Sequence, residues 1–249
     1  MPVQTRPLRI LIVEDNAINA RLAVAILKVQ GHDTTVRSNG QEALDALQRE
    51  PFDVVLMDEQ MPVMSGLEAV ARIRKSEELT GRHVPIVALT ANATEEDRER
   101  CLAAGVDGYV AKPIQEEELF TAIANLCTGS APTMRVESRP DTEDAFRREL
   151  AGMFLADCPK SMSTIRAAVA GRDGPGLRLA AHTLKGSAGA FKDSAAVAAA
   201  LRMEKVGQDE DWENAGSAGL ALAGEMERLS ASLLDTCRES TNGRNGKGK

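Results

Sequence analysis

Several residue types that carry specific chemistry are scarce in this chain of 249 residues. It contains three histidines, four cysteines, one tryptophan, one tyrosine and five phenylalanines. The cysteines lack CxxC or CxH spacing, which disfavours a zinc site or a disulfide framework and favours reduced thiols. With so few aromatic residues, alanine, leucine and valine must fill most of the core. No run of 18 apolar residues occurs, so we expect no transmembrane helix.

A surplus of positive charge is also missing. The net charge is −7, and all of it falls in residues 1–126, because residues 127–249 carry equal numbers of acidic and basic side chains. Nucleic-acid binding requires a basic face, so we expect no nucleic-acid partner. Length and composition are typical of a globular protein with one or two domains, and we expect it in the cytoplasm.

The first half of the chain alternates between short apolar runs and helical patterns. The runs predict strands at 9–14, 33–38, 53–58, 85–90 and 108–112. The patterns between them predict helices at 17–30, 40–49, 66–76, 95–104 and 116–126. Near-continuous apolar strands that alternate with helices indicate a doubly wound, five-stranded parallel sheet covered on both faces.

The strand pattern stops near residue 128. Residues 128–141, TGSAPTMRVESRPD, have no apolar period and are predicted to form a linker. Beyond the linker, short connections predict an antiparallel helical bundle over 142–237, followed by a disordered polar tail at 238–249. The first domain then covers 1–127. Within the bundle we expect helices at 142–157, 160–171, 176–191, 193–206 and 211–236, with a break at Pro159.

Polar residues end four of the predicted strands. They are Glu14 and Asp15, Asp58, Thr90 and Lys112. The carboxyl ends of parallel strands meet at one edge, so these side chains are expected to converge. Clustered carboxylates suit Mg²⁺, and a cation, a hydroxyl and an ammonium around one point can hold a phosphoryl group. The pattern predicts a phosphoryl-transfer site with an aspartate as nucleophile.

The residues beside these side chains fit the same chemistry. The loop EQMPVMSG after Asp58 leaves backbone groups free near its carboxylate. Ala91 follows Thr90 and is too small to block approach. Pro113 follows Lys112, and a cis peptide there is expected to aim the lysine.

The motifs VEDN, LMDEQMPVMSG, LTANA and GYVAKP together resemble the receiver domain of bacterial two-component response regulators, over residues 8–126. The resemblance implies a flavodoxin-like fold with Asp58 as the phosphoacceptor. It implies a Mg²⁺ site formed by Glu14, Asp15, Asp58 and the backbone carbonyl of Gln60. It also implies switching or phosphate-sensing roles for Thr90, Ala91, Tyr109, Lys112 and Pro113.

A phosphohydrolase with an aspartyl nucleophile is the enzymatic alternative. Common enzymes of that kind carry a second aspartate two residues after the nucleophile as general acid, and here that position is Gln60. Nothing in the sequence resembles an ATP-binding kinase module. We therefore expect a phosphotransfer protein without kinase activity of its own.

The stretch AHTLKGSAGAF in the second half contains His182. Apolar residues recur around it at helical spacing and predict one core-facing stripe, formed by Leu177, Ala181, Leu184, Ala188 and Phe191. His182 lies about 200° around the helix from Leu184, so we expect it off the stripe or at its edge. Its neighbours at helical spacing include no acid; they are Arg178, Lys185, Gly186 and Gly189. This predicts a bare, basic face around an exposed imidazole, rather than a core residue, a metal ligand or a general base.

The same stretch resembles the HxLKGxA signature of the histidine-containing phosphotransfer (HPt) domain, and LRMEKVG at 201–207 fits that family's following helix. The resemblance implies that His182 is phosphorylated, that Lys185 assists and that Gly186 clears space. Arg178 and Gly189 would support docking of an anionic partner.

The two resemblances together predict a two-component phosphorelay protein. A sensor histidine kinase, or another phosphohistidine, would phosphorylate Asp58, and His182 would pass phosphoryl groups to or from a receiver aspartate, in this chain or in another response regulator. In the alternative, the receiver gates docking of the HPt domain through an intramolecular contact, without internal transfer. The chain could also be the C-terminal part of a hybrid kinase.

Overall fold

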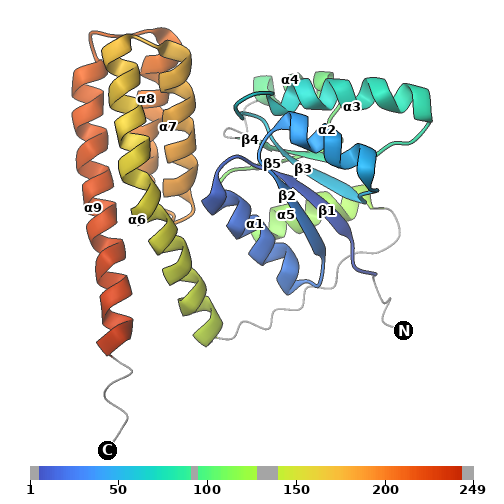
Figure 1. The fold of residues 1–249 in the computed structure, drawn as a ribbon, viewed down its shortest axis with the longest axis horizontal. Helices are drawn as coiled ribbons and strands as arrows, with labels where there is room; N and C mark the ends of the chain where they lie inside the picture. The colour runs from blue at the N-terminus through green and yellow to red at the C-terminus, as the bar shows by residue number, and fades with distance from the viewer. Residues whose placement is uncertain (1–5, 91–94, 128–139, 243–249) are drawn as a thin grey trace, which may run out of the picture. The chain divides into compact units, whose positions relative to one another are not determined.

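The computed structural model of the chain describes residues 6–90, 95–127 and 140–242. The chain divides into two compact units, Met1–Arg135 and Val136–Lys249. The first unit is a parallel sheet flanked by helices and the second is helical, which confirms the predicted fold class (Figure 1). The predicted boundaries at residues 127 and 141 stay a prediction, because 128–139 lies outside the described residues.

The sheet of the first unit has the strand order β2-β1-β3-β4-β5, and all pairs are parallel. Its strands are β1 (Arg9–Val13), β2 (Asp33–Arg37), β3 (Val54–Asp58), β4 (Ile86–Thr90) and β5 (Gly108–Ala111). The helices between them are α1 (Ala17–Val29), α2 (Gly40–Arg49), α3 (Gly66–Thr80), α4 (Glu95–Ala104) and α5 (Glu116–Leu126). These ranges confirm the predicted alternation.

Strand residues alternate between two buried clusters. Leu11 and Val13 of β1 pack with residues of α2, α3 and α4, whereas Ile10 and Ile12 pack with α1 and α5. Both faces are therefore covered, as near-continuous apolar strands require. The strand order changes direction at β1, which has β2 on one side and β3 on the other. The crevice beyond the carboxyl ends of β1 and β3 is where such sheets bind ligands.

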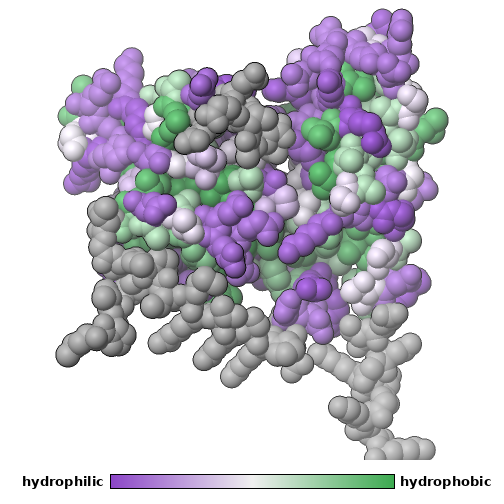
Figure 2. Space-filling model, turned by 180° about the vertical axis from the view of Figure 1, so that it is seen from behind, coloured by the Kyte–Doolittle hydropathy of each residue, from purple (hydrophilic) through white to green (hydrophobic). Residues whose placement is uncertain are grey.

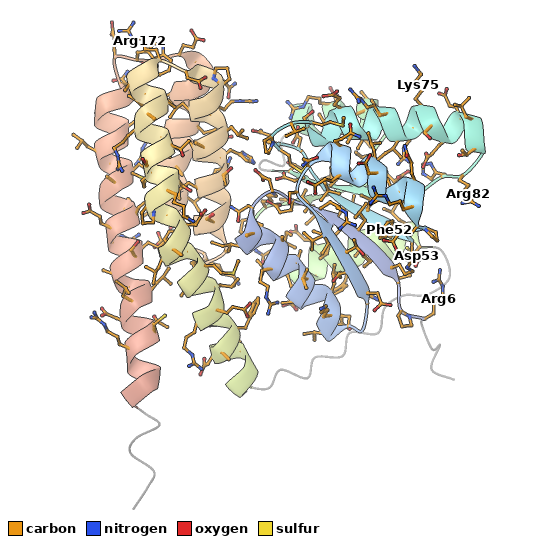
Figure 3. All side chains as sticks on the ribbon, in the orientation of Figure 1. Arg6, Phe52, Asp53, Lys75, Arg82 and Arg172 are labelled. Carbon is orange, nitrogen blue, oxygen red and sulfur yellow. The ribbon has the colours of Figure 1, made fainter. Side chains whose placement is uncertain are left out.

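A polar and aromatic cluster stabilises the other end of the sheet, where β1 and β3 begin. The Asp53 carboxylate, just before β3, accepts a hydrogen bond from the Arg9 backbone N–H at 2.8 Å and forms an ion pair with Arg6. The Arg9 guanidinium lies 5.6 Å from the centroid of the Phe52 ring. Figure 3 labels Arg6, Phe52 and Asp53 at this end. These contacts join β1 to the start of β3, away from the edge that carries Asp58.

The second unit consists of α6 (Pro140–Gly171), α7 (Gly174–Gly189), α8 (Ser194–Asp209) and α9 (Ala215–Asn242). The long helices α6 and α9 continue past the ends of α7 and α8 (Figure 1). The predicted break at Pro159 is wrong, because α6 runs through it. Proline removes one N–H and one helical hydrogen bond. Packing of α6 against its neighbouring helices on both sides of Pro159 keeps the helix continuous.

The predicted start of a disordered tail at 238 is also wrong in part, because α9 continues to Asn242. Residues 243–249 lie outside the described residues. The predicted apolar stripe of α7 is confirmed, since Leu177, Ala181, Leu184 and Ala188 are all buried. Phe191, just after α7, meets Phe154 of α6 edge to face, with ring centroids 5.4 Å apart.

On the face that Figure 2 shows, the described surface is mainly polar. Figure 2 shows hydrophilic residues spread over the visible face, with apolar residues between them in small groups. Among the described helices, none is long and apolar enough to cross a membrane.

Candidate functional site

Three carboxylates converge at the carboxyl ends of β1 and β3. Oxygens of Glu14, Asp15 and Asp58 all lie within 4.8 Å of one another. Glu14 and Asp58 are buried, and Asp15 is half-buried. Asn19 of α1 and the backbone N–H of Asn16 donate to Glu14 Oε1 at 3.2 and 3.3 Å. The convergence follows from the switch in strand order at β1, which places these strand ends side by side.

Lys112 enters this cluster from the end of β5. Its Nζ lies 2.7 Å from Glu14 Oε2 and 2.8 Å from Asp58 Oδ2. Burial alone would lower the pKa of the lysine, but the charges of the two carboxylates outweigh it and raise the pKa. Lys112 is therefore a permanent cation between two acids.

The charge of Lys112 does not balance the cluster. Burial and the nearby Asp58 charge raise the pKa of Glu14 to about 7, although Lys112 acts in the opposite direction. Three carboxylates face one ammonium, so the described cluster has excess negative charge. The donor set is made of hard oxygens, which Mg²⁺ prefers, and a divalent cation would offset this excess. The residues present therefore fit the predicted metal.

The loop after Asp58 wraps closely around the nucleophile. The Gln60 backbone N–H donates to Asp58 Oδ1 at 3.3 Å. Gly66 opens α3 so near the strand that a Cβ atom there would lie 1.9 Å from the Asp58 carbonyl oxygen. Only glycine fits this position without moving the loop. This explains the glycine that ends the loop sequence EQMPVMSG.

The other predicted receiver residues lie around the same edge. Thr90 is buried at the end of β4, and its carbonyl accepts a hydrogen bond from the Lys112 backbone N–H at 2.7 Å. The peptide between Lys112 and Pro113 is cis, as the sequence predicts. Tyr109 on β5 is 37% exposed. Ala91 lies outside the described residues.

A second polar cluster lies in the helical unit. Glu204 of α8 accepts a hydrogen bond at Oε1 from His182 Nδ1, 2.9 Å away, and forms an ion pair through Oε2 with Lys185 Nζ. His182, Lys185 and Glu204 are all buried. Burial would raise the pKa of Glu204, but hydrogen bonds and charge attraction from His182 and Lys185 outweigh it and lower the pKa.

Two expectations about His182 are therefore wrong. The imidazole is not exposed on a bare face, and it does not lack an acid. The helical count placed it off the apolar stripe of α7, and that position meets α8 instead of solvent. Helical spacing within α7 could not reveal Glu204, which is 22 residues away in sequence.

The sequence held one signal for Glu204. It lies on the side of α8 that carries Ala200 and Gly207, both buried. A Cβ atom at Gly207 would lie 2.7 Å from the Arg178 backbone nitrogen, so α7 and α8 approach closely there. An acid within a row of small buried residues indicates a partner on the facing helix.

The remaining predicted support residues differ in exposure. Arg178 is exposed, Gly186 is half-buried and Gly189 is buried. The described contacts include no ion pair between Arg178 and the histidine cluster. The part of the basic face that interacts with the histidine is therefore Lys185, through Glu204.

Two family models match the chain: the response regulator receiver domain over residues 10–124 and the Hpt domain over 149–232. The hybrid signal transduction histidine kinase I of Dictyostelium discoideum is 42% identical over 125 residues, 48% of this chain and 7% of that protein. Sensor histidine kinase GacS of Pseudomonas protegens is 33% identical over 207 residues, 74% of this chain and 23% of that protein. The chain thus spans less than a quarter of either kinase.

Among solved structures, the receiver domain of sensor histidine kinase PA1611 from Pseudomonas aeruginosa is 40% identical. That structure has a magnesium ion coordinated in its active-site cleft. The match covers 50% of this chain and 100% of that one, with a TM-score of 0.46.

Proposed function

Because the chain belongs to the two-component signalling proteins, with a response regulator receiver domain followed by an Hpt domain, we propose that it relays phosphoryl groups between Asp58 and His182. The observation that supports this most is the presence of two complementary clusters. One holds a carboxylate nucleophile in an anionic pocket with a lysine, and the other holds an oriented imidazole. Neither matched domain is an ATP-binding module, so the phosphoryl group would come from a histidine kinase.

In the receiver, an Asp58 carboxylate oxygen attacks the phosphorus of a phosphohistidine. A P–O bond forms, the P–N bond breaks, and the departing imidazole nitrogen keeps the electron pair. Lys112 already lies 2.8 Å from Asp58 Oδ2, so it can pair with a phosphoryl oxygen attached there. The Thr90 hydroxyl is proposed to donate to another. Mg²⁺ bound by Glu14, Asp15, Asp58 and the Gln60 carbonyl would supply positive charge to the phosphoryl oxygens.

In the Hpt domain, Glu204 sets which imidazole nitrogen reacts. A carboxylate that accepts from Nδ1 keeps the proton there and leaves the Nε2 lone pair available. Nε2 is therefore the proposed phosphoryl acceptor, and phosphorylation leaves an imidazolium that the Glu204 charge stabilises. Lys185 balances that charge in the unphosphorylated state. Among the described residues, three potential metal ligands come together only at Glu14, Asp15 and Asp58, so the receiver pocket is proposed to supply the electrostatic stabilisation.

The proposed partners are a sensor histidine kinase and the receiver domain of another response regulator. We propose the cytoplasm as the location, where the thiols of the four cysteines, all free in the structure, would stay reduced. Tyr109 and Pro113 are proposed to take part in switching and in aiming Lys112.

Labelling by a small phosphodonor tests the relay. The wild-type chain, Asp58→Asn and His182→Gln are incubated with acetyl phosphate and Mg²⁺, and the acid and base stability of the label is measured. The relay predicts an acid-labile, base-stable label on His182 of the wild type that is absent from Asp58→Asn. His182→Gln should retain only the base-labile acyl phosphate. A histidine that never acquires label, even from a phosphorylated kinase, would favour the gating alternative, in which the receiver controls docking of the Hpt domain without transfer.

A further inference from the structure

The loop between β3 and α3 holds one residue in an unusual backbone conformation. Val63 has a φ of +68°, and the Met64 N–H donates to the Pro62 carbonyl across it at 2.8 Å. A three-residue turn closed by this bond, with positive φ at its centre, is the rare and strained form of the γ-turn. Positive φ is a true outlier for a β-branched residue.

The surroundings of Val63 impose this conformation. Met61 and Met64 on either side are buried in the core. The Gly66 N–H closes the loop by donating to the Glu59 carbonyl at 3.1 Å. The chain must therefore turn between the two methionines, and the Val63 side chain projects outward with 86% of its surface exposed.

Nothing among the described contacts accounts for valine at this position. The side chain is too exposed to stabilise the core, and its branching makes the turn harder to form. A strained conformation persists only where the surrounding structure imposes it, and such conformations are concentrated at functional sites. Val63 is five residues after Asp58 and lies on the loop that wraps around the nucleophile.

Building on the proposed function, we propose that Val63 is a docking contact for the histidine-bearing helix pair of an Hpt domain, such as that of a second copy of this chain. An imidazole that reaches Asp58 must bring its helices over the loops around the pocket. On α8, Leu201 is 43% exposed and lies three residues, about one helical turn, before Glu204. Leu201 is the proposed apolar counterpart of Val63.

An apolar contact suits this position. It adds affinity in proportion to the apolar surface that it removes from water, and it places no charge beside the phosphoryl group that would compete with Lys112. The valine side chain thus serves a transient complex at the cost of backbone strain in the free receiver.

The test uses transfer between two full-length variants. His182→Gln is loaded on Asp58 with acetyl phosphate, and Asp58→Asn accepts the phosphoryl group on His182. Varying the acceptor concentration gives a KM and a maximal rate. Val63→Asn is then added to the donor, because asparagine tolerates positive φ far better than valine does.

The contact predicts that Val63→Asn raises the KM for transfer roughly tenfold, while loading by acetyl phosphate is unchanged. Relief of strain predicts a receiver melting temperature that is equal or higher, by up to about 4 °C. Leu201→Asn in the acceptor should raise the KM similarly, and the two changes together should be less than additive.

Leu79→Asn is the matched control. Leu79 is 89% exposed and lies on α3 roughly 20 Å from Gly66 along the helix, between Lys75 and Arg82, which Figure 3 labels at that end. This variant should leave the KM unchanged.

A KM in Val63→Asn equal to that of Leu79→Asn overturns the docking contact, even if transfer between the parent variants is efficient. A lower melting temperature overturns the strain argument, and full additivity overturns Leu201 as the counterpart. Absence of both transfer between the parent variants and phosphohistidine in the wild type refutes the proposed function, and with it the docking contact.

Discussion

Glu14 in the receiver and Glu204 in the Hpt domain are both buried glutamates that form an ion pair with a lysine, yet their pKa values move in opposite directions. The Glu14 carboxyl lies near Asp58, and its pKa rises to about 7. The Glu204 carboxyl lies between Lys185 and His182, and its pKa falls. Burial opposes the charged form in both. At Glu14 burial is the largest effect and the Asp58 charge adds to it, whereas at Glu204 the hydrogen bonds and charges of His182 and Lys185 outweigh burial.

The comparison shows that the two sites have different charge balance. The receiver pocket has more negative than positive charge, and a bound divalent cation would offset the excess. The Hpt cluster is balanced internally and needs none. This division suits a relay, because one pocket can supply the metal and the lysine for transfer in both directions.

Removal of Mg²⁺ is expected to produce the largest contrast between the sites. With a chelator present, loading of Asp58 by acetyl phosphate should fall by about a thousandfold, since metal stabilisation of a phosphoryl transition state contributes several kcal/mol. Trp212, the single tryptophan of the chain, lies between α8 and α9. The melting temperature of the Hpt domain, followed by its fluorescence, should not change. Loading that persists without divalent cations would contradict the proposed role of the acidic cluster.

Loss of Glu204 should disrupt the balanced site. Glu204→Ala leaves the buried Lys185 ammonium without its partner and should destabilise the Hpt domain by about 3 kcal/mol. Urea unfolding followed by Trp212 fluorescence measures the change. The control is Glu225→Ala, which removes the half-exposed partner of Arg228 and should cost less than about 1 kcal/mol. Equal effects of the two variants would contradict a buried charge cluster.

The two lysines should respond differently to neutral substitution. Lys112→Met removes the cation from the acidic pocket and should slow Asp58 loading by about a hundredfold while tightening Mg²⁺ binding. Lys185→Met removes the ion-pair partner of Glu204, which then interacts with His182 only. This variant should slow transfer by only about tenfold. Calorimetric Mg²⁺ titration and single-turnover kinetics measure these effects. Weaker Mg²⁺ binding in Lys112→Met would be inconsistent with the excess negative charge.

Acidification should have the smallest effect, and it should act through Glu204. A carboxyl whose pKa is lowered on folding contributes stability above its unfolded value of about 4.5. That contribution is lost as the pH falls through the lower, folded pKa. Unfolding curves between pH 6 and pH 3 should therefore show a loss of about 1 kcal/mol that is absent from Glu204→Ala. The same slope in both proteins would assign the effect to other groups.

Much of the fold could be predicted from local pattern. Strands such as Val54–Asp58 are continuous apolar runs, and Asn16, Asn39 and Ser65 cap the helices that follow them with their side chains. The predicted break at Pro159 is wrong, because α6 continues through the proline. Packing of α6 on its neighbours outweighs one missing hydrogen bond.

The receiver site was predictable because its residues end strands, and strand ends of a parallel sheet must meet. The Hpt site was only half predictable. His182 and Lys185 share one turn of α7, so helical spacing relates them, whereas Glu204 reaches them across a helix pair whose register depends on tertiary packing.

By itself, the sequence indicated which residues are proposed to carry the chemistry: the acids and the lysine at the strand ends, and the histidine and lysine in AHTLKGSAGAF. Strand topology predicts that the first group converges, and the resemblance to the HPt signature implies the roles of the second. Only the tertiary structure decided how each group is charged and where it points. The pKa of a carboxyl depends on burial and on neighbours within a few ångströms, and Glu204 and Val63 acquire their surroundings only when distant segments pack together.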